Sequence, residues 1–220
     1  NFINPITFET LTGNKCLVDT FDRNFQFNVE HISLAKLADI FLVAPASADV
    51  IGKIANGIAD DMLTTTIMAC KCPKLISPAM NTNMFTNPIV QDNLKKLEHY
   101  GYEIIQPDSG YLACGDTGAG KMPSEQVLLN YILRTIAKDK DMAGIKLTVT
   151  AGPTREKLDP VRFLSNNSTG KMGYAIAKMA MLRGADVTLI SGKVSLEPVP
   201  FVKMVDIVSA EDMYNAVIKI

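Results

Sequence analysis

The stretch Ile40-Phe41-Leu42-Val43-Ala44-Pro45-Ala46-Ser47-Ala48 decides the fold class. Residues 40–44 form a continuous apolar run, which is typical of a strand buried on both faces of a sheet. The small residues after it predict a tight loop, and a helical pattern begins at about Asp49. A buried strand, a short loop and a helix together form the unit from which parallel α/β sheets are built.

The same order of strand, loop and helix continues toward the C-terminus. Residues 74–77 predict a second buried strand, residues 91–100 a helix, and residues 102–106 a short third strand. The alternation predicts an α/β fold with a Rossmann-like or flavodoxin-like parallel sheet. Ligands of such sheets bind at the carboxyl ends of the strands, where Ala44-Pro45-Ala46-Ser47 and Pro78-Ala79-Met80-Asn81 are expected to lie.

A second domain is predicted after the charge run Lys138-Asp139-Lys140-Asp141. Strand patterns at 145–150 and 185–190 enclose a helical pattern at 170–183, so the β-loop-α order restarts. We expect residues 1–138 to form the first domain, without its first strand. Residues 144–220 are then the N-terminal part of a second Rossmann-like domain, and the chain is expected to be a fragment at both ends.

Composition and charge exclude several classes of protein. The 220 residues carry a net charge of −1, which gives no electrostatic case for binding nucleic acid or an anionic membrane. No apolar run reaches the ~20 residues that span a bilayer, and no signal-peptide pattern opens the chain, so we expect a cytoplasmic protein. The four cysteines include one C-x-C pair, Cys70 and Cys72; no zinc site is expected, and three of the thiols are expected to be reduced.

Three side chains offer proton-transfer or hydrogen-bonding chemistry. His31 begins a helical pattern; it suits a proton-transfer role, although spacing alone favours a plain polar residue at a helix start. Asn81 can hold a carboxylate, or it can form an Asx turn before a helix. Cys114 lies in the glycine-rich segment 113–122, which favours a mobile flap over a ligand rather than a core thiol. His99 is expected on the surface.

Other loops give weaker signals. Ser47 follows small residues that let a flat ring approach the backbone, and it can donate to a ligand or cap a helix. Asp60 and Asp61 form a carboxylate pair without a third ligand, so we interpret them as a helix-end or interface feature. The loop Ser165-Asn166-Asn167-Ser168-Thr169-Gly170-Lys171-Met172-Gly173 leads into a helix and suits a phosphate, although it is not a Walker A loop.

Taken together, these blocks resemble the bifunctional coenzyme A biosynthesis flavoproteins, which join a phosphopantothenoylcysteine decarboxylase to a phosphopantothenate–cysteine ligase. In the first domain the resemblance rests on His31, a PASANT-like segment (45–50), a PxMNxxMW-like segment (78–85) and an ACGDxGxGRM-like segment (113–122). In the second it rests on Ala151-Gly152-Pro153-Thr154-Arg155-Glu156 and residues 159–166. The sequence departs from the family pattern at Asp49-Val50, Phe85 and Lys121.

The resemblance implies FMN-dependent decarboxylation of 4'-phosphopantothenoylcysteine to 4'-phosphopantetheine, through oxidation of the cysteine side chain to a thioaldehyde before CO2 leaves. It implies that His31 is the base, that Asn81 orients the substrate carboxylate and that Cys114 supplies a proton. The implied FMN contacts are Phe2, Ser47, Ala48, Asp49, Val50, Ala79 and Met80. The implied substrate contacts are Asn81, Met84, Ala113, Gly115, Asp116 and Lys121.

For the second domain the resemblance implies ligation of cysteine to 4'-phosphopantothenate with CTP and Mg2+, by residues that include Asn166, Ser168, Gly170 and Lys171. It also implies a homo-oligomer built from trimers, in which residues 56–66 face a neighbouring copy. Two alternatives stay open: a peptidyl-cysteine decarboxylase, and a non-catalytic regulatory or binding subunit with a protein partner. The second domain argues against the former, and Cys114 argues against the latter.

Overall fold

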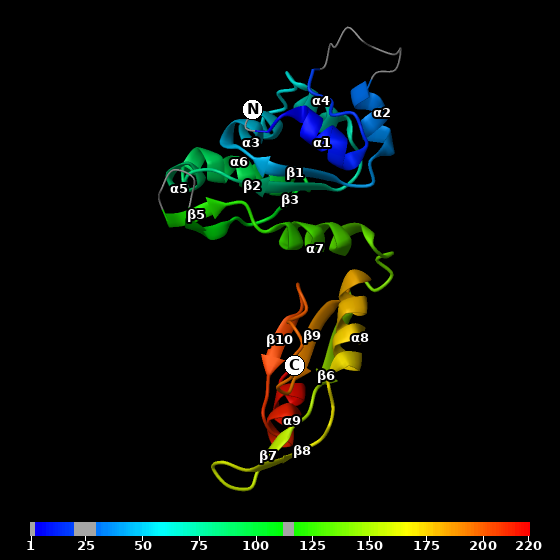
Figure 1. The fold of residues 1–220 in the computed structure, drawn as a ribbon, viewed down its shortest axis with the longest axis vertical. Helices are drawn as coiled ribbons and strands as arrows, with labels where there is room; N and C mark the ends of the chain where they lie inside the picture. Colours follow the sequence, from blue (N-terminus) through cyan, green and yellow to red (C-terminus); the bar gives the residue numbers. More distant parts are fainter. Residues whose placement is uncertain (1–2, 20–29, 112–116) are drawn as a thin grey trace. The chain divides into compact units, whose positions relative to one another are not determined.

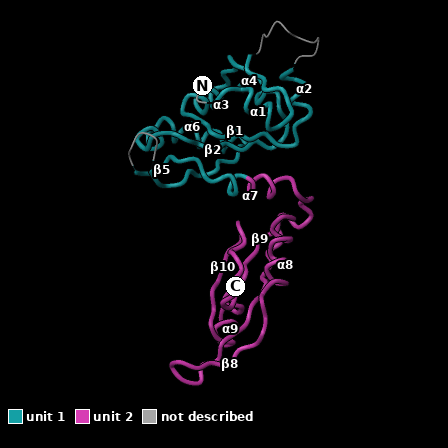
Figure 2. The backbone as a smooth tube through the Cα atoms, in the orientation of Figure 1, with its two compact units in different colours: residues 1–128 teal, residues 129–220 magenta. Residues whose placement is uncertain are grey.

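The computed structural model describes residues 3–19, 30–111 and 117–220 (Figure 1). The chain divides into two compact units, residues 1–128 and residues 129–220, which are coloured separately in Figure 2. None of the described helices combines the length and the apolar character needed to cross a bilayer.

Unit 1 contains a parallel sheet with the strand order β1-β2-β3. These strands are β1 (Phe41–Ala46), β2 (Lys74–Pro78) and β3 (Glu103–Ile104). Both pairs of neighbouring strands run parallel, and in the first pair Val43 lies opposite Ile76 and Ala46 opposite Pro78. The apolar runs of the sequence therefore form the parallel sheet that they predict.

Five of the described helices of unit 1 begin where a polar side chain accepts a hydrogen bond from one of their first amide groups. Such N-terminal capping by Asn, Asp or Ser stabilises a helix because the first N–H groups have no carbonyl partner within it. The capping residues are Asn4, Ser47, Asp61, Asn81 and Asn87. The helices are α1 (Pro5–Thr12), α2 (Glu30–Leu37), α3 (Ala48–Ala55), α4 (Met62–Ala69), α5 (Thr82–Phe85) and α6 (Pro88–His99).

The core of unit 1 is built on the centres of β1 and β2. Val43 and Ile76 are buried there with Ile51 of α3, Ile67 of α4 and Leu97 of α6. Burying side chains of this size stabilises the fold by about 1.5–3 kcal/mol each. The strand ends are thereby held rigidly, and the loops that follow them keep fixed positions. A hairpin of β4 (Asp108–Tyr111) and β5 (Thr117–Lys121) completes the unit before α7 (Glu125–Ile136).

Unit 2 contains a second parallel sheet, with the order β10-β9-β6. The predicted strands and helix are present as β6 (Lys146–Ala151), β9 (Asp186–Ser191) and α8 (Lys171–Leu182). The sequence did not predict the edge strand β10 (Lys203–Asp206) or the antiparallel hairpin of β7 (Arg155–Lys157) and β8 (Phe163–Ser165). Helix α9 (Ala210–Ile218) ends the described chain, after the capping box of Ser209 and Asp212.

The two units divide inside α7, earlier than the boundary at 138–144 that the sequence predicts. The C-terminal half of this helix packs within unit 2. The ring of Tyr131 lies edge-on to Phe201 with centroids 4.8 Å apart, and the Arg134 guanidinium lies 4.2 Å from the same ring. The domain limits at 138 and 144 stay a prediction.

Candidate functional site

The loops after β1 and β2 lie side by side at the carboxyl edge of the first sheet. The N–H of Ala79 donates to the carbonyl of Ala46 at 2.9 Å, directly beyond the pairing of Ala46 with Pro78. Parallel topology brings these loops together because both strands end at the same edge. The sequence segments around Ser47 and Asn81 therefore form one surface.

Ser47 caps α3 at this edge of the sheet. Its Oγ accepts the N–H of Val50 at 3.3 Å, so the hydroxyl proton still has a direction in which to donate. Ala48 is half-buried. The carboxylate of Asp49 lies 3.6 Å from the Lys53 ammonium, one turn further along the helix. Ser47 therefore acts locally as a helix cap, which is one of the two roles that the sequence predicts for it.

Asn81 is half-buried and caps α5. Its Oδ1 accepts the N–H of Asn83 at 2.8 Å, which is the geometry of an Asx turn. This bond fixes the orientation of the side-chain amide, because the oxygen end is directed at the helix. The nitrogen end is the donor that a ligand carboxylate would require. The Asx turn uses the oxygen of the amide, and a contact with a ligand carboxylate would use its nitrogen.

Strand β5 packs against the loop that carries Asn81. The N–H of Met80 donates to the carbonyl of Gly120 at 3.0 Å. A Cβ atom on Gly120 would lie 2.2 Å from the Met80 carbonyl oxygen, and one on Gly118 would lie 2.4 Å from Thr82 Oγ1. Gly118 and Gly120 of β5 are therefore required for this close approach. The base of the hairpin is fixed beside Asn81.

Buried polar atoms without hydrogen-bond partners are rare in folded proteins and call for an explanation. Three occur in the described part of the chain, and two of them, Ser77 Oγ and Thr82 Oγ1, belong to the segment that contains Asn81. The third is Arg155 Nε in unit 2. The concentration at residues 77–82 marks this segment as a candidate site, not only a connection.

The structure does not bring every expected residue to this edge. Ala79 and Met80 are half-buried in the site loop, Met84 is 48% exposed on α5, and Lys121 is exposed at the end of β5. Half-buried His31 belongs to α2, which packs against α4. In Figure 1, α2 and α5 lie at opposite ends of unit 1. Phe2, Ala113, Cys114, Gly115 and Asp116 lie outside the described residues.

Asp61 of the carboxylate pair caps a helix, which is one of the two interpretations that the sequence left open. Asp61 and Thr64 form a capping box at the start of α4, and Lys53 Nζ lies 3.0 Å from Asp60 and 3.6 Å from Asp61. Burial opposes ionisation of Asp61, but the hydrogen bonds from Thr64 and the charge of Lys53 outweigh it and lower its pKa. Within the described residues, no three His, Cys, Asp or Glu side chains are grouped to hold a metal.

In unit 2, a cavity of about 540 Å³ opens at the carboxyl end of β6, in front of α8. Ser168 and Gly170 line it, together with Ala151 and Gly152, whereas Lys171, the first residue of α8, is not one of the lining residues. Asn166 stands just before the lining residues of this loop, and its Oδ1 accepts the N–H of Ser168 at 2.9 Å. The predicted phosphate loop therefore borders a real cavity.

Helix α8 begins at Gly170, which has φ +75° and provides no side-chain cap. The helix also approaches the sheet closely, since a Cβ atom on Gly173 would lie 2.6 Å from the Cβ of Ala151. An uncapped helix N-terminus carries partial positive charge and amide donors. This end of α8 is suited to an anionic group in the cavity.

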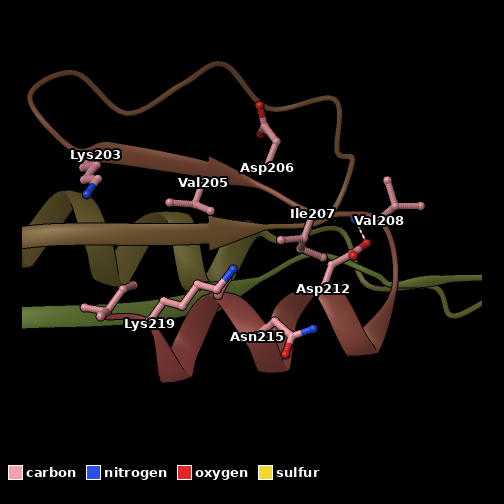
Figure 3. A pocket seen from close by; sticks show the side chains of 10 residues that line it. Lys203, Val205, Asp206, Ile207, Val208, Asp212, Asn215 and Lys219 are labelled. Atoms are coloured by element: carbon pink, nitrogen blue, oxygen red, sulfur yellow. Dashed lines mark hydrogen bonds between the residues drawn. The ribbon is translucent and has the colours of Figure 1, made fainter.

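Sequence reasoning missed an open groove of about 650 Å³ between β10 and α9 (Figure 3). Lys203, Asp206 and Lys219 border it, but no spacing in the sequence links these residues. The carboxylate of Asp212 lies in the same groove and accepts the N–H groups of Ser209 and Val208. The hydrogen bonds from Ser209 and then Val208 lower the pKa of Asp212. The Asp212 carboxylate therefore stabilises the start of α9 by accepting these hydrogen bonds.

Comparison with known proteins identifies the class. Residues 1–137 match the family model described as Flavoprotein, and residues 142–220 match the model described as DNA/pantothenate metabolism flavoprotein C-terminal domain. The chain belongs to the flavoprotein family. This agrees with the parallel α/β sheets of both units and confirms the resemblance found in the sequence.

Particular relatives narrow the class further. The chain is 45% identical over 222 residues to the coenzyme A biosynthesis bifunctional protein CoaBC of Bacillus subtilis, covering 100% of this chain and 55% of that protein. It is 42% identical over 216 residues to CoaBC of Escherichia coli K12, covering 98% and 53%. The chain thus spans about half the length of the curated relatives it matches.

Several solved structures have a fold similar to part of the chain. A mutant PPC decarboxylase complexed with pantothenoylaminoethenethiol is 34% identical with a TM-score of 0.50, over 54% of this chain and 68% of that one. The FMN binding protein AtHal3 is 34% identical with a TM-score of 0.50, over 56% and 71%. The epidermin biosynthesis protein EpiD of Staphylococcus aureus is 30% identical with a TM-score of 0.51, over 59% and 76%.

Proposed function

We propose that the chain carries an FMN-dependent decarboxylase of coenzyme A biosynthesis, which converts 4'-phosphopantothenoylcysteine to 4'-phosphopantetheine. The observation that carries this proposal is the meeting of three segments at one sheet edge: the loop at Ser47, the loop at Asn81 and strand β5. The similarity to CoaBC proteins extends along nearly the whole of this chain, and it supports the choice of substrate.

The edge of the first sheet fits the ring of FMN better than its phosphate. Ala48 and Ala79 are half-buried and have no side chain beyond Cβ, so a flat ring can approach the backbone there. Ser47 offers a hydroxyl, while Asp49 would repel a phosphate at the start of α3. We propose that Ser47, Ala48, Asp49, Val50, Ala79 and Met80 hold the ring, with Phe2 beside them. When bound, FMN would supply the two-electron oxidation that makes loss of CO2 feasible, and would afterwards return the two electrons so that the product leaves as a thiol.

Asn81 is proposed to orient the substrate carboxylate through its side-chain nitrogen. A neutral amide suits this task because it binds the carboxylate without stabilising it as strongly as a cation would. Less binding energy is then lost when the carboxylate leaves as CO2. Met84, Lys121 and the flap residues Ala113, Gly115 and Asp116 are proposed to enclose the rest of the substrate. The flap also keeps water away from the reacting carbon.

Two further side chains are proposed to move protons. His31 accepts a proton from the substrate at an imidazole nitrogen during its oxidation, since neutral imidazole is a good base near pH 7. Cys114 then donates its thiol proton to the carbon that CO2 has left. Because α2 lies away from α5 and β5 within one copy, we propose that a homo-oligomer built from trimers brings His31 of one copy to Asn81 of another.

This assembly has a direct test by mixing. His31→Asn and Asn81→Asp should each be inactive alone. When the two variants are unfolded and refolded together, mixed oligomers should contain some sites with both native residues and recover a measurable fraction of activity. Complete absence of recovery, with mixed oligomers demonstrated by native mass spectrometry, would contradict the shared site.

For unit 2 we propose the N-terminal part of a phosphopantothenate–cysteine ligase, which uses CTP and Mg2+. The cavity before the uncapped end of α8 supports binding of a phosphate group. Ser168, Gly170 and Lys171 are proposed to hold it, with Asn166 near the acyl intermediate. We assign residues 1–138 to the decarboxylase and residues 144–220 to the ligase part, and a cytoplasmic location to the protein.

Anaerobic flavin spectroscopy tests the decarboxylase. The full chain loaded with FMN is mixed under argon with 4'-phosphopantothenoylcysteine, and separately with a peptide that ends in cysteine. Bleaching of the flavin band and CO2 release with the first substrate only are expected. Reaction with the peptide only would indicate a peptidyl-cysteine decarboxylase. A chain that retains FMN but reacts with neither would be a binding subunit, and the proposal would be wrong.

A further inference from the structure

Helix α5, which Asn81 caps, has only four residues, Thr82–Phe85. Helices shorter than ~12 residues are marginal in water by themselves, so a helix of this length depends on contacts with the rest of the fold. After Thr86 and Asn87, the chain continues as the longer helix α6, which lies beside α5 (Figure 1). The contacts of α5 with its neighbours therefore determine where the Asn81 loop lies.

Helix α6 is anchored firmly in unit 1. Its side chains Leu94 and Leu97 are buried in the core, 6% and 1% exposed. Its first turn is capped by Asn87, whose Oδ1 accepts the N–H of Ile89 at 2.9 Å. The N–H of Gln91 donates to the Asn87 carbonyl at 3.0 Å. The backbone of Gln91 is thereby fixed at the start of a well-supported helix.

The side chain of Gln91 connects α6 to the last residue of α5. Gln91 is half-buried, and its Nε2 donates to the carbonyl of Phe85 at 2.5 Å. The last carbonyls of a helix have no partner within it, so this bond satisfies one of them. The N–H of Phe85 donates to the carbonyl of Asn81 at 2.9 Å, and Phe85 packs against the core of unit 1. Two hydrogen bonds through Phe85 thus connect Gln91 to the backbone of Asn81.

We propose that Gln91 is a positioning residue for the decarboxylation, which fixes Asn81 through Phe85. This inference rests on the proposed function, in which Asn81 holds the substrate carboxylate. Gln91 needs no contact with substrate or flavin for this role. A displacement of about 1 Å at a binding group lowers a reaction rate strongly even when its cause lies far from the reacting atoms. The bond from α6 therefore contributes to catalysis at a distance.

Removal of the donor tests the role in the full chain loaded with FMN. Gln91→Met keeps the length of the side chain but leaves the Phe85 carbonyl without its partner. We expect kcat/KM for 4'-phosphopantothenoylcysteine to fall roughly tenfold, with the FMN content unchanged. Gln106→Met is the matched control, since Gln106 is exposed after β3, and its kcat/KM should stay native. Circular dichroism checks folding, and Gln91→Glu replaces Gln91→Met if that variant does not fold.

Ligand binding separates positioning from mere stability. Two ligands are compared: the product 4'-phosphopantetheine, which lacks the carboxylate, and the substrate analogue with serine in place of the cysteine moiety, which keeps it. Gln91→Met should weaken binding of the analogue roughly tenfold, because a displaced Asn81 no longer meets the carboxylate. Its affinity for the product should stay native. Equal losses for both ligands would show a general structural defect and would overturn the proposal.

A double-mutant cycle tests whether Gln91 acts through Asn81. In the Asn81→Asp background, Gln91→Met should lower the residual kcat/KM by less than roughly twofold, because the group that it positions is already lost. An undiminished tenfold loss in that background, or native kcat/KM in Gln91→Met alone, would refute the role of Gln91 while the native chain remains active. A native chain that does not decarboxylate 4'-phosphopantothenoylcysteine would refute the proposed function and this inference with it.

Discussion

The helices at the carboxyl edges of the two sheets differ in how their N-termini are capped. In unit 1, the helices after β1 and β2 start with capping side chains, Ser47 and Asn81. In unit 2, the helix before the cavity starts at Gly170 without a side-chain cap. A capped start already has an acceptor for its amide groups, whereas an uncapped start takes one from a ligand. This difference agrees with the proposal that the edge of unit 1 binds a neutral ring and a carboxylate, and that the edge of unit 2 binds a phosphate.

Asn81→Asp should have the largest effect. Aspartate keeps the oxygen that caps α5, but it removes the amide donor and repels the substrate carboxylate. We expect kcat/KM to fall by at least about 100-fold, with FMN content and melting temperature little changed. Asn87→Asp is the matched control, because Asn87 caps α6 in the same way through a 2.9 Å bond. Equal losses in both variants would contradict the assignment of Asn81.

Gly118→Ala should have the next largest effect, since the added Cβ would lie 2.4 Å from Thr82 Oγ1. The hairpin must move away from the Asn81 loop, and we expect kcat/KM to fall roughly thirtyfold through lost positioning. Gly110→Ala in the partner strand is the control, because the nearest atom there is 3.6 Å away. Adding Thr82→Ala should restore part of the activity. A Gly118→Ala variant with native activity would show that the contact does not position the flap.

A substitution of Lys171 tests whether the uncapped N-terminus of α8 binds a phosphate group. Lys171→Gln removes a positive charge at the first residue of α8, and should weaken CTP binding by roughly tenfold at low salt. Lys178→Gln changes an exposed lysine further along the same helix and should have little effect. Isothermal titration calorimetry measures both. If the two variants lose the same affinity, the effect is one of overall charge and not of the helix end.

Asp61→Ala should have the smallest effect, a loss of about 1 kcal/mol in the free energy of unfolding, through loss of the cap on α4. Asp60→Ala is the control, since Asp60 is exposed and caps no helix. The folded-state pKa of Asp61 is lowered, so its contribution is fully present above the unfolded pKa of about 3.9 and is lost as pH falls through the lower folded pKa. Denaturant unfolding of the two variants at pH 7 and pH 3 checks this: their difference should shrink at pH 3.

The sequence predicted β1 and β2 because continuous apolar runs encode them. The runs at 41–46 and 74–78 lie within one or two residues of the predicted strands. Strand β10 escaped prediction because an exposed lysine and an exposed aspartate enclose only two half-buried residues, as suits a strand at the edge of a sheet. The residues of β8 are all exposed, so no alternation marks that hairpin.

The sequence predicted those parts of the candidate site that are defined by their position directly after a strand. Ser47 and Asn81 attract attention because each follows a buried strand, and topology then places them at one edge. The contact between Gly118 and Thr82 joins distant segments, so only the folded chain reveals why that glycine is needed. Likewise, the spacing before β1 predicts the helix of His31 but does not tell which end of the sheet this helix approaches.

A crystal structure of the full chain with FMN and 4'-phosphopantothenoylcysteine tests the central claim most directly. We expect the substrate carboxylate to accept a hydrogen bond from the side-chain nitrogen of Asn81 at about 3 Å. The flavin ring should lie against the loop at Ser47. A carboxylate held elsewhere, with Asn81 contacting neither substrate nor flavin, would contradict the account.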